Sequence, residues 1–373
     1  MRIEVDVAPG LPGFTIVGLA DAALRESRER VRGALRNAGF VHPPRRITVN
    51  LAPADVPKAG SALDLGIAIA VLVGSEQVHP RGRWAMLGEL GLGGEVRPVP
   101  GLLPMIAALA RRGAGRVVVP ADALDEARLV PGIEALPAAS LGHAVELVRG
   151  RRVRGRGPMT RAELIPDEAD TRPSPAPTDE GWPDLADVRG QAEARRALEI
   201  AVAGGHALLM IGAPGSGKTL LARTIPGLLP PLDPAEAYEA TVIASVAGEG
   251  PVRSLLTRRP FRAPHHTASY AALVGGGPRL APGEVTRAHN GVLFLDELPE
   301  FDRAAREAIR QPLEEGRVAI ARANGAVEMP ARFQLVAAMN PCPCEFRLQQ
   351  GSGTRRLPGR SSDHPRQASR CAW

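Results

Sequence analysis

Lysine is nearly absent from this sequence of 373 residues, because Lys58 and Lys218 are its only two lysines and arginine carries the remaining positive charge. The three cysteines, Cys342, Cys344 and Cys371, are too few for a disulfide-stabilised fold. No apolar run approaches the roughly 20 residues of a membrane span, and the N-terminus lacks the pattern of a signal peptide. We therefore expect a cytoplasmic protein without a membrane segment.

Aromatic residues are also scarce, at 3%, although the hydrophobic fraction of 44% is ordinary for a globular protein. The length predicts two domains, each large enough for its own core. A net charge of +6 is compatible with nucleic-acid binding but does not establish it. Residues 149–161 alone hold six arginines, so a solvated basic linker and tail explain the charge equally well.

Residues 212–219 read GAPGSGKT and fit G-x-x-x-x-G-K-[ST], a loop whose backbone N–H groups surround phosphates. Its glycines permit a close approach to the anion. Lys218 would bridge the terminal phosphates of a nucleotide, and the Thr219 hydroxyl would hold Mg²⁺. The predicted phosphate-binding residues are Gly212, Ala213, Pro214, Gly215, Ser216, Gly217, Lys218, Thr219 and Leu220.

The surroundings of this loop favour the same interpretation. Ala207–Ile211 is a short apolar run that predicts a buried parallel strand. Leu220–Ile225 predicts a helix ended by Pro226. This order directs a helix N-terminus at a phosphate.

A second apolar run, Val292–Leu295, is followed by two carboxylates. A buried strand here would place Asp296 near Mg²⁺ and Glu297 where it can polarise an attacking water. Either motif alone also fits a glycine-rich turn or a solvated strand end. Together, in this order, they predict a P-loop ATPase.

The remaining pattern predicts four regions. Residues 1–149 form one α/β domain, 150–183 a linker rich in arginine, acid and proline, 184–344 a second α/β unit, and 345–373 a disordered tail. In the first domain we expect strands at 3–7, 46–51 and 117–119, and a hairpin from 84–89 and 94–98. We expect helices at 21–37, with Asp21 as the N-terminal cap, and at 61–73, 102–112 and 141–149.

Longer segments resemble the magnesium-chelatase-like AAA+ ATPases, and within them the ComM/YifB family. These segments are Arg259–Thr267, Ala272–Gly277 and His289–Phe301, with Gly10–Gly18, Glu26–Val31 and Ile47–Asp55 in the first half. The resemblance implies a Lon-protease-like (ribosomal S5 domain 2-like) α/β domain followed by a P-loop AAA+ αβα sandwich. It also implies a hexameric, ATP-driven motor that acts on single-stranded or branched DNA in natural transformation.

The resemblance assigns roles to single residues. The cofactors would be ATP and Mg²⁺, with Thr219 and Asp296 as metal ligands. Lys218, Glu297 and Asn340 would be catalytic, Asn340 being the sensor 1 residue. Gln191 would lie near the adenine, and the segments 314–318 and 326–330 would form a hairpin facing a pore. The adjacent His265 and His266 would have a structural or inter-subunit role rather than a metal, because no second ligand cluster lies at usable spacing.

Other functions remain open. Pro57–Ser61 resembles the loop that carries the serine of Lon-type proteases, but Val99–Pro104, where the dyad lysine is expected, contains none. We expect Ser61 and Asp64 to cap the following helix instead. A chelatase-type ATPase subunit that drives metal insertion, and a nucleotide-binding scaffold without turnover, are the alternative functions.

The resemblance ends after Cys344. Family members continue with a second cysteine pair, a Leu-Asp-Arg segment and a helical lid, none of which follows here. A transition-state arginine is worth on the order of 10³–10⁵ in rate. We therefore expect weak ATP turnover and doubt that the chain completes a hexamer. Without the second cysteine pair, no four-thiolate zinc site is available within the chain. We expect that the tail arose from a frameshift or that the sequence is a fragment.

Overall fold

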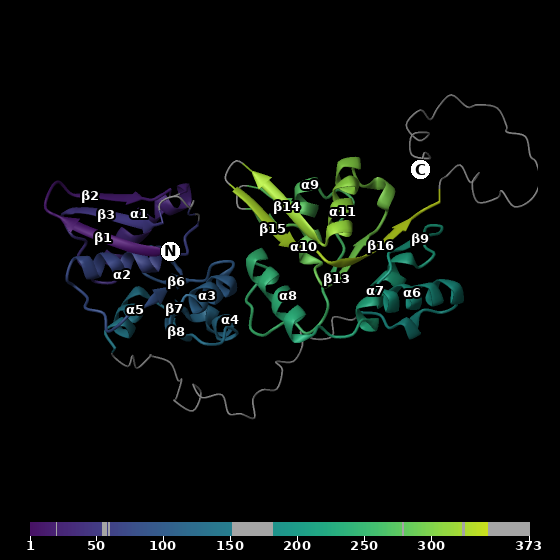
Figure 1. Cartoon of the computed structure of the whole chain (residues 1–373), viewed down its shortest axis with the longest axis horizontal. Helices are drawn as coiled ribbons and strands as arrows, with labels where there is room; N and C mark the ends of the chain where they lie inside the picture. Colours follow the sequence, from purple (N-terminus) through teal and green to yellow (C-terminus); the bar gives the residue numbers. More distant parts are fainter. Residues whose placement is uncertain are drawn as a thin grey trace, which may run out of the picture. The chain divides into compact units, whose positions relative to one another are not determined.

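The computed structural model describes residues 1–19, 21–53, 58, 60–150, 182–277, 280–322 and 325–341. Residues 151–181 of the predicted linker and the predicted tail at 345–373, with all three cysteines, lie outside the described residues. The chain forms two compact units (Figure 1). The first contains 1–150 and Ala237–Leu256, and the second 182–236, 257–322 and 326–341. Both mix helices and strands, which confirms the predicted α/β class.

The first unit is built from two small sheets, a hairpin and the helices that cover them. Its strands are β1 (Arg2–Ala8), β2 (Gly13–Val17), β3 (Arg46–Ala52), β4 (Ala85–Met86), β5 (Glu89–Leu90), β6 (Val96–Arg97), β7 (Arg116–Pro120) and β8 (Glu134–Ala138). Its helices are α1 (Ala22–Asn37), α2 (Asp64–Gly74), α3 (Leu102–Arg111), η1 (Ala121–Ala123), α4 (Leu124–Arg128) and α5 (Leu141–Val148), with most of α8 (Pro234–Ala247).

The first sheet has the order β1-β3-β2, with β3 antiparallel to β1 and parallel to β2. Period-2 alternation along β3 buries Ile47, Val49 and Leu51 completely. Helices α1 and α2 pack against each other, α2 contacts β1, and α1 contacts β2 (Figure 1). The second sheet, β4-β7-β8, is wholly parallel.

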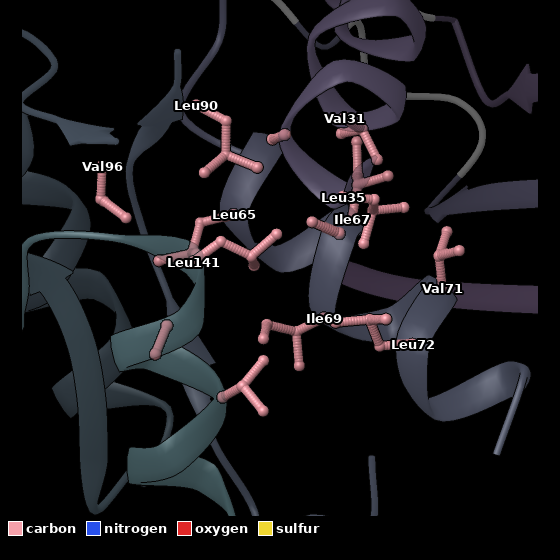
Figure 2. Close-up of a cluster of buried hydrophobic side chains, with 14 of the residues drawn as sticks. Val31, Leu35, Leu65, Ile67, Ile69, Val71, Leu72, Leu90, Val96 and Leu141 are labelled. Carbon is pink, nitrogen blue, oxygen red and sulfur yellow. The ribbon is translucent and has the colours of Figure 1, made fainter. Parts of the chain in front are cut away.

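Helix α2 forms the centre of the first core. Its residues are apolar around nearly the whole circumference, which is typical of a buried helix. Figure 2 shows Leu65 and Ile69 of α2 among side chains of α1, such as Leu35, and Leu141 of α5. The N-terminal end of α1 agrees with the sequence, since Asp21 accepts a hydrogen bond from the Leu24 amide at 2.7 Å.

Two local predictions in this unit are wrong. Helix α2 begins after Leu63 with no side-chain cap. The Ser61 hydroxyl instead donates to Glu89, and Asp64 binds the Arg30 guanidinium at 2.6 Å. Long-range partners therefore outcompete local capping. The expected hairpin is shorter than predicted, since β5 pairs with β6 whereas β4 joins the second sheet.

The described part of the second unit contains a four-stranded parallel sheet and two separate two-stranded sheets. Its strands are β9 (Leu208–Ile211), β10 (Phe261–Arg262), β11 (Gly275–Gly276), β12 (Ala281–Pro282), β13 (Gly291–Leu295), β14 (Arg317–Arg322), β15 (Gly325–Pro330) and β16 (Phe333–Met339). Its helices are η2 (Leu185–Asp187), α6 (Ala192–Gly204), α7 (Lys218–Leu228), α9 (Tyr270–Val274), α10 (Glu284–Arg287), η3 (Leu298–Glu300) and α11 (Arg303–Glu315).

The main sheet has the order β10-β13-β16-β9, and every described pairing in it is parallel. Strand β13 is buried along its whole length, as predicted. Strand β9 is not: it lies at an edge of the described sheet, and Leu209 and Ile211 are about half exposed. Pro226 also lies within α7 rather than ending it, in the last turn before Leu228. The predicted hairpin before sensor 1 is present as β14-β15.

One segment from within the predicted ATPase region packs with the first unit. The Gly101 amide donates to the Ser245 carbonyl at 2.8 Å, and the Ser245 hydroxyl donates to the buried Glu126 at 2.6 Å. Glu126 also accepts from the Leu103 amide at 3.0 Å. Segment Ala237–Leu256 therefore contributes to the core beneath α3 and α4. None of the helices that the structure describes has the length and apolarity to span a membrane.

Candidate active site

The glycine-rich loop joins β9 to α7 and has the backbone geometry that its glycines allow. Gly215 and Gly217 have φ of 75° and 86°, in the left-handed region that strains other residues. A Cβ at Gly212 would lie 2.8 Å from the Ser216 hydroxyl oxygen. The loop therefore curls tightly and ends at the N-terminus of α7, where unpaired amides and the helix dipole favour an anion.

Lys218 connects the loop with the end of β16. Its Nζ donates to the carbonyls of Gly212 and Ala213, at 2.8 and 2.9 Å, and to Asn340 Oδ1 at 3.0 Å. Lys218 and Asn340 are 122 positions apart in sequence. They meet because β16 pairs directly with β9, so the carboxyl ends of the two strands lie at the same edge of the sheet.

The next residue, Thr219, reaches the end of β13. Its hydroxyl donates to Asp296 Oδ2 at 2.7 Å. A hydroxyl and a carboxylate are the oxygen donors that Mg²⁺ prefers, and the ion usually takes one or two such protein ligands together with substrate phosphates and waters. The residues present therefore fit a magnesium–nucleotide complex at this edge.

Glu297 is held beside the histidine pair. It adopts a left-handed conformation with φ of 53°, and its Oε2 lies 3.1 Å from His266 Nδ1. The parallel register explains the contact, because Arg262 of β10 pairs with Leu293 of β13. His266 lies four residues after Arg262, and Glu297 lies four residues after Leu293, so the two residues lie equally far along the chain from a paired position. Sequence spacing carries no signal for this contact, which depends on strand pairing.

The neighbouring histidine has a different partner. The His265 and His266 rings lie 4.1 Å apart, and His265 Nδ1 lies 2.9 Å from the Thr267 hydroxyl. Within the described ranges, no three side chains of His, Cys, Asp or Glu are grouped as a metal would require. Of the two histidines, His266 is the one in contact with Glu297.

Gln191 contacts the phosphate loop. It precedes α6 with φ of 53°, and its side-chain amide donates to the Ser216 carbonyl. A Cβ at Gly217 would lie 3.7 Å from Gln191 Nε2. These contacts place Gln191 at the phosphate loop, and its predicted position near an adenine remains a prediction.

Arg259, in the segment Arg259–Thr267, forms an ion-pair clamp whose partners lie elsewhere in the sequence. Its guanidinium binds both oxygens of Glu236, at 3.0 and 2.8 Å, and the carbonyl of Asn290 at 2.9 Å. The hydrogen bonds from Arg259 hold the pKa of Glu236 below its usual range. Since Asn290 immediately precedes β13, the clamp fixes the start of the strand that carries Asp296 and Glu297.

A second ion pair supports the same strand pairing. Arg262 of β10 binds Glu284 through two hydrogen bonds, at 2.8 and 3.1 Å. Burial alone would raise the pKa of Glu284, but Arg262 and Arg287 outweigh it and the pKa is lowered. Both arginine clamps start in the segment Arg259–Thr267, so their presence in one motif was the available signal.

The residues considered for a protease dyad have other partners. Ser61 donates to Glu89, and the buried Lys58 donates through Nζ to the Pro53 carbonyl. A serine hydroxyl needs an adjacent base to act as a nucleophile. The described contacts of Ser61 and Lys58 do not form such a pair.

Both halves of the chain are similar to known proteins. A family model described as magnesium chelatase, subunit ChlI, matches residues 184–367. A second, described as subunit ChlI of Mg-chelatase, matches residues 3–123. A Lon protease of Halothermothrix orenii is 26% identical over 138 residues, which cover 35% of this chain and 18% of that protein.

Three relatives match most of the chain. An uncharacterized protein of Mycobacterium tuberculosis is 50% identical over 351 residues, covering 92% of this chain and 66% of that protein. The competence protein ComM of Haemophilus influenzae is 45% identical over 346 residues, with the same coverage. The uncharacterized protein YifB of Escherichia coli is 44% identical over 345 residues, covering 92% and 65%. The chain thus spans slightly less than two thirds of each of these relatives.

Proposed function

Because this chain belongs to the ComM/YifB family of magnesium-chelatase-like AAA+ ATPases, we propose that it binds ATP with Mg²⁺ and hydrolyses it. A Lon-like domain precedes its AAA+ core. We further propose that the energy of hydrolysis drives a motor activity on DNA in the cytoplasm. The observation that carries the proposal is the convergence of Lys218, Asn340 and the Thr219–Asp296 pair at one edge of the parallel sheet. The DNA part rests on the name of one relative, a competence protein.

Each side chain has a task in this proposal. Bound magnesium–ATP supplies an electrophilic γ-phosphorus and a good leaving group. Lys218 binds the terminal phosphates, while Thr219 and Asp296 hold the metal. Glu297 orients a water and accepts its proton, and Asn340 positions the same water. We also propose that the protein assembles into a hexameric ring and that its partner is single-stranded or branched DNA.

The test is ATP turnover by the purified chain, with and without single-stranded and branched DNA. Lys218→Ala should abolish nucleotide binding and turnover. Glu297→Gln should keep binding but lower turnover by about 10²-fold or more, because it removes the base. Glu307→Gln, an exposed change on α11, is the matched control and should behave as the wild type. Equal turnover in the wild type and Glu297→Gln would refute the assignment, and binding without any turnover would indicate a scaffold.

The description of the matching family models as a magnesium-chelatase subunit favours a second candidate function, an ATPase subunit that drives metal insertion into a tetrapyrrole. The relatives that match 92% of this chain carry other names, so we place it second. Capture of a large chelatase partner by the purified chain, together with no response of turnover to DNA, would reverse this order.

A further inference from the structure

The first unit contains a cavity of about 550 Å³ that no motif pointed to. It lies between the exposed face of α1, the start of β2 and the segment before β3, and its lining includes Phe14, Arg28, Arg32, Arg36 and His42. A volume in this range suits a small ligand or a few units of a polymer. The cavity is far in sequence from the phosphate loop and belongs to the other unit.

The cations of this cavity are arranged along one helix face. Arg28, Arg32 and Arg36 follow one another at intervals of four residues on α1. At 1.5 Å per residue, this spacing puts successive arginines about 6 Å apart along the helix. The adjoining face of α1 is buried through residues such as Val31 and Leu35. The arginine row therefore lies at the surface of the helix as a stripe of positive charge.

Most of this charge is not neutralised. Arg28 pairs with Glu29 at 3.0 Å, and Glu29 is the acidic residue of the lining. In the part of the chain that the structure describes, Arg32 and Arg36 form neither a side-chain hydrogen bond nor an ion pair. The excess positive charge of the cavity thus resides on these two exposed side chains.

His42 provides a second, independent observation. Its Nε2 is buried and has no hydrogen-bond partner among the described residues. Burial, with the nearby charge of Arg32, lowers the pKa of His42. A buried polar atom without a partner is costly unless a ligand or water satisfies it. The Phe14 ring lies 6.2 Å from the His42 ring, so an aromatic surface adjoins the cationic row.

We propose that this cavity binds the phosphate backbone of single-stranded DNA, with Arg32 and Arg36 contacting successive phosphates and His42 at the inner wall. A positive groove beside an aromatic ring is the usual means of binding single strands without sequence preference. A recess of this volume is of small-ligand size, so it admits about one or two nucleotides of a single strand, whereas the paired bases of a duplex cannot enter it. The inference rests on the proposed function in that its ligand is DNA, but it places the contact in the Lon-like domain.

The test is fluorescence anisotropy of a labelled 15-nucleotide oligo-dT with the full chain, at several salt concentrations. Arg32→Ala/Arg36→Ala should weaken binding about tenfold at moderate salt. Each phosphate contact contributes about 0.7 to the slope of log K against log salt for single strands, so the slope should fall by about 1.4. A blunt duplex of the same length should bind the wild type and this variant alike.

Matched variants separate the site from net charge and from folding. Arg111→Ala/Arg112→Ala removes two exposed arginines near the end of α3, elsewhere in the same unit, and should leave both affinity and slope unchanged. Arg32→Lys/Arg36→Lys keeps the charge and should bind within about twofold of the wild type. An unchanged affinity in Arg32→Ala/Arg36→Ala, or an equal loss in the α3 control or on duplex, would overturn the proposal.

The two proposals can fail separately. If turnover responds to DNA but Arg32→Ala/Arg36→Ala binds like the wild type, only the cavity is wrongly assigned. If that variant loses binding while wild-type turnover never responds to DNA, the cavity stands and the proposed function is wrong.

Discussion

His266 Nδ1 lies 3.1 Å from Oε2 of Glu297, the residue that we assign as the catalytic base. Neither side chain is fully buried, since His266 is 31% and Glu297 48% exposed. The contact holds the carboxylate in one orientation at the end of β13. On the proposed assignment of Glu297 as the base, we expect His266 to position its carboxylate toward the attacking water.

We expect His266→Ala to lower kcat for ATP about tenfold without changing nucleotide affinity, since a misplaced base loses part of the 10²–10⁴-fold effect of general base catalysis. His265→Ala, which removes the neighbouring ring and its Thr267 contact, should change kcat by less than about twofold. Steady-state turnover and a labelled-nucleotide binding assay measure both quantities. An equal loss in the two variants would point to a loop defect instead.

Thr219→Val should raise the Mg²⁺ concentration needed for half-maximal turnover by at least about tenfold, because it removes a metal ligand and even the loss of an outer-shell partner costs about 10–100-fold in metal affinity. The substitution keeps the shape of the side chain but removes the hydroxyl that lies 2.7 Å from Asp296. Thr219→Ser retains that hydroxyl and should need Mg²⁺ as the wild type does. Titrations of Mg²⁺ at saturating ATP provide the measurement, and identical midpoints would contradict the ligand assignment.

Asp64→Asn should destabilise the first unit by about 3 kcal/mol, because it leaves the charge of Arg30 without its partner. Asp64 is fully buried, binds Arg30 at 2.6 Å and also accepts from Ser27. The pKa of Arg30 is raised, chiefly by its hydrogen bond to Asp64. Urea denaturation measures the loss. Asp125→Asn, in the exposed pair with Arg128, should cost under about 1 kcal/mol.

The stability of the first unit should fall as pH drops from about 7 to 5. Burial lowers the pKa of His143, and burial with nearby arginines lowers that of His42. A lowered folded pKa means that the unfolded chain binds protons first, so stabilisation is complete above the unfolded value of about 6.5 and is lost below it. His143→Gln should flatten this dependence in urea denaturation at pH 7.5 and 5.5. His79→Gln, at an exposed histidine whose ring has no partner among the described residues, should leave it unchanged.

The local sequence pattern was sufficient to predict the structure where the interacting residues are close in sequence. The strand–loop–helix order around Gly212–Thr219, the buried run before Asp296 and the cap at Asp21 all follow from adjacent residues. Local pattern failed where a distant partner competed. Ser61 was expected to cap α2, but its hydroxyl donates a hydrogen bond to the Glu89 carboxylate instead.

What the sequence determined by itself is the chemistry of the phosphate loop and the family to which the chain belongs, because both are encoded in contiguous motifs. The tertiary structure alone decided that Asn340 reaches Lys218, that His266 reaches Glu297, and that Ala237–Leu256 packs with the first unit. It also decided that Arg32 and Arg36 share a cavity with His42. The physical reason is that strand order, register and helix packing bring residues together irrespective of their separation along the chain, and no local spacing records that outcome.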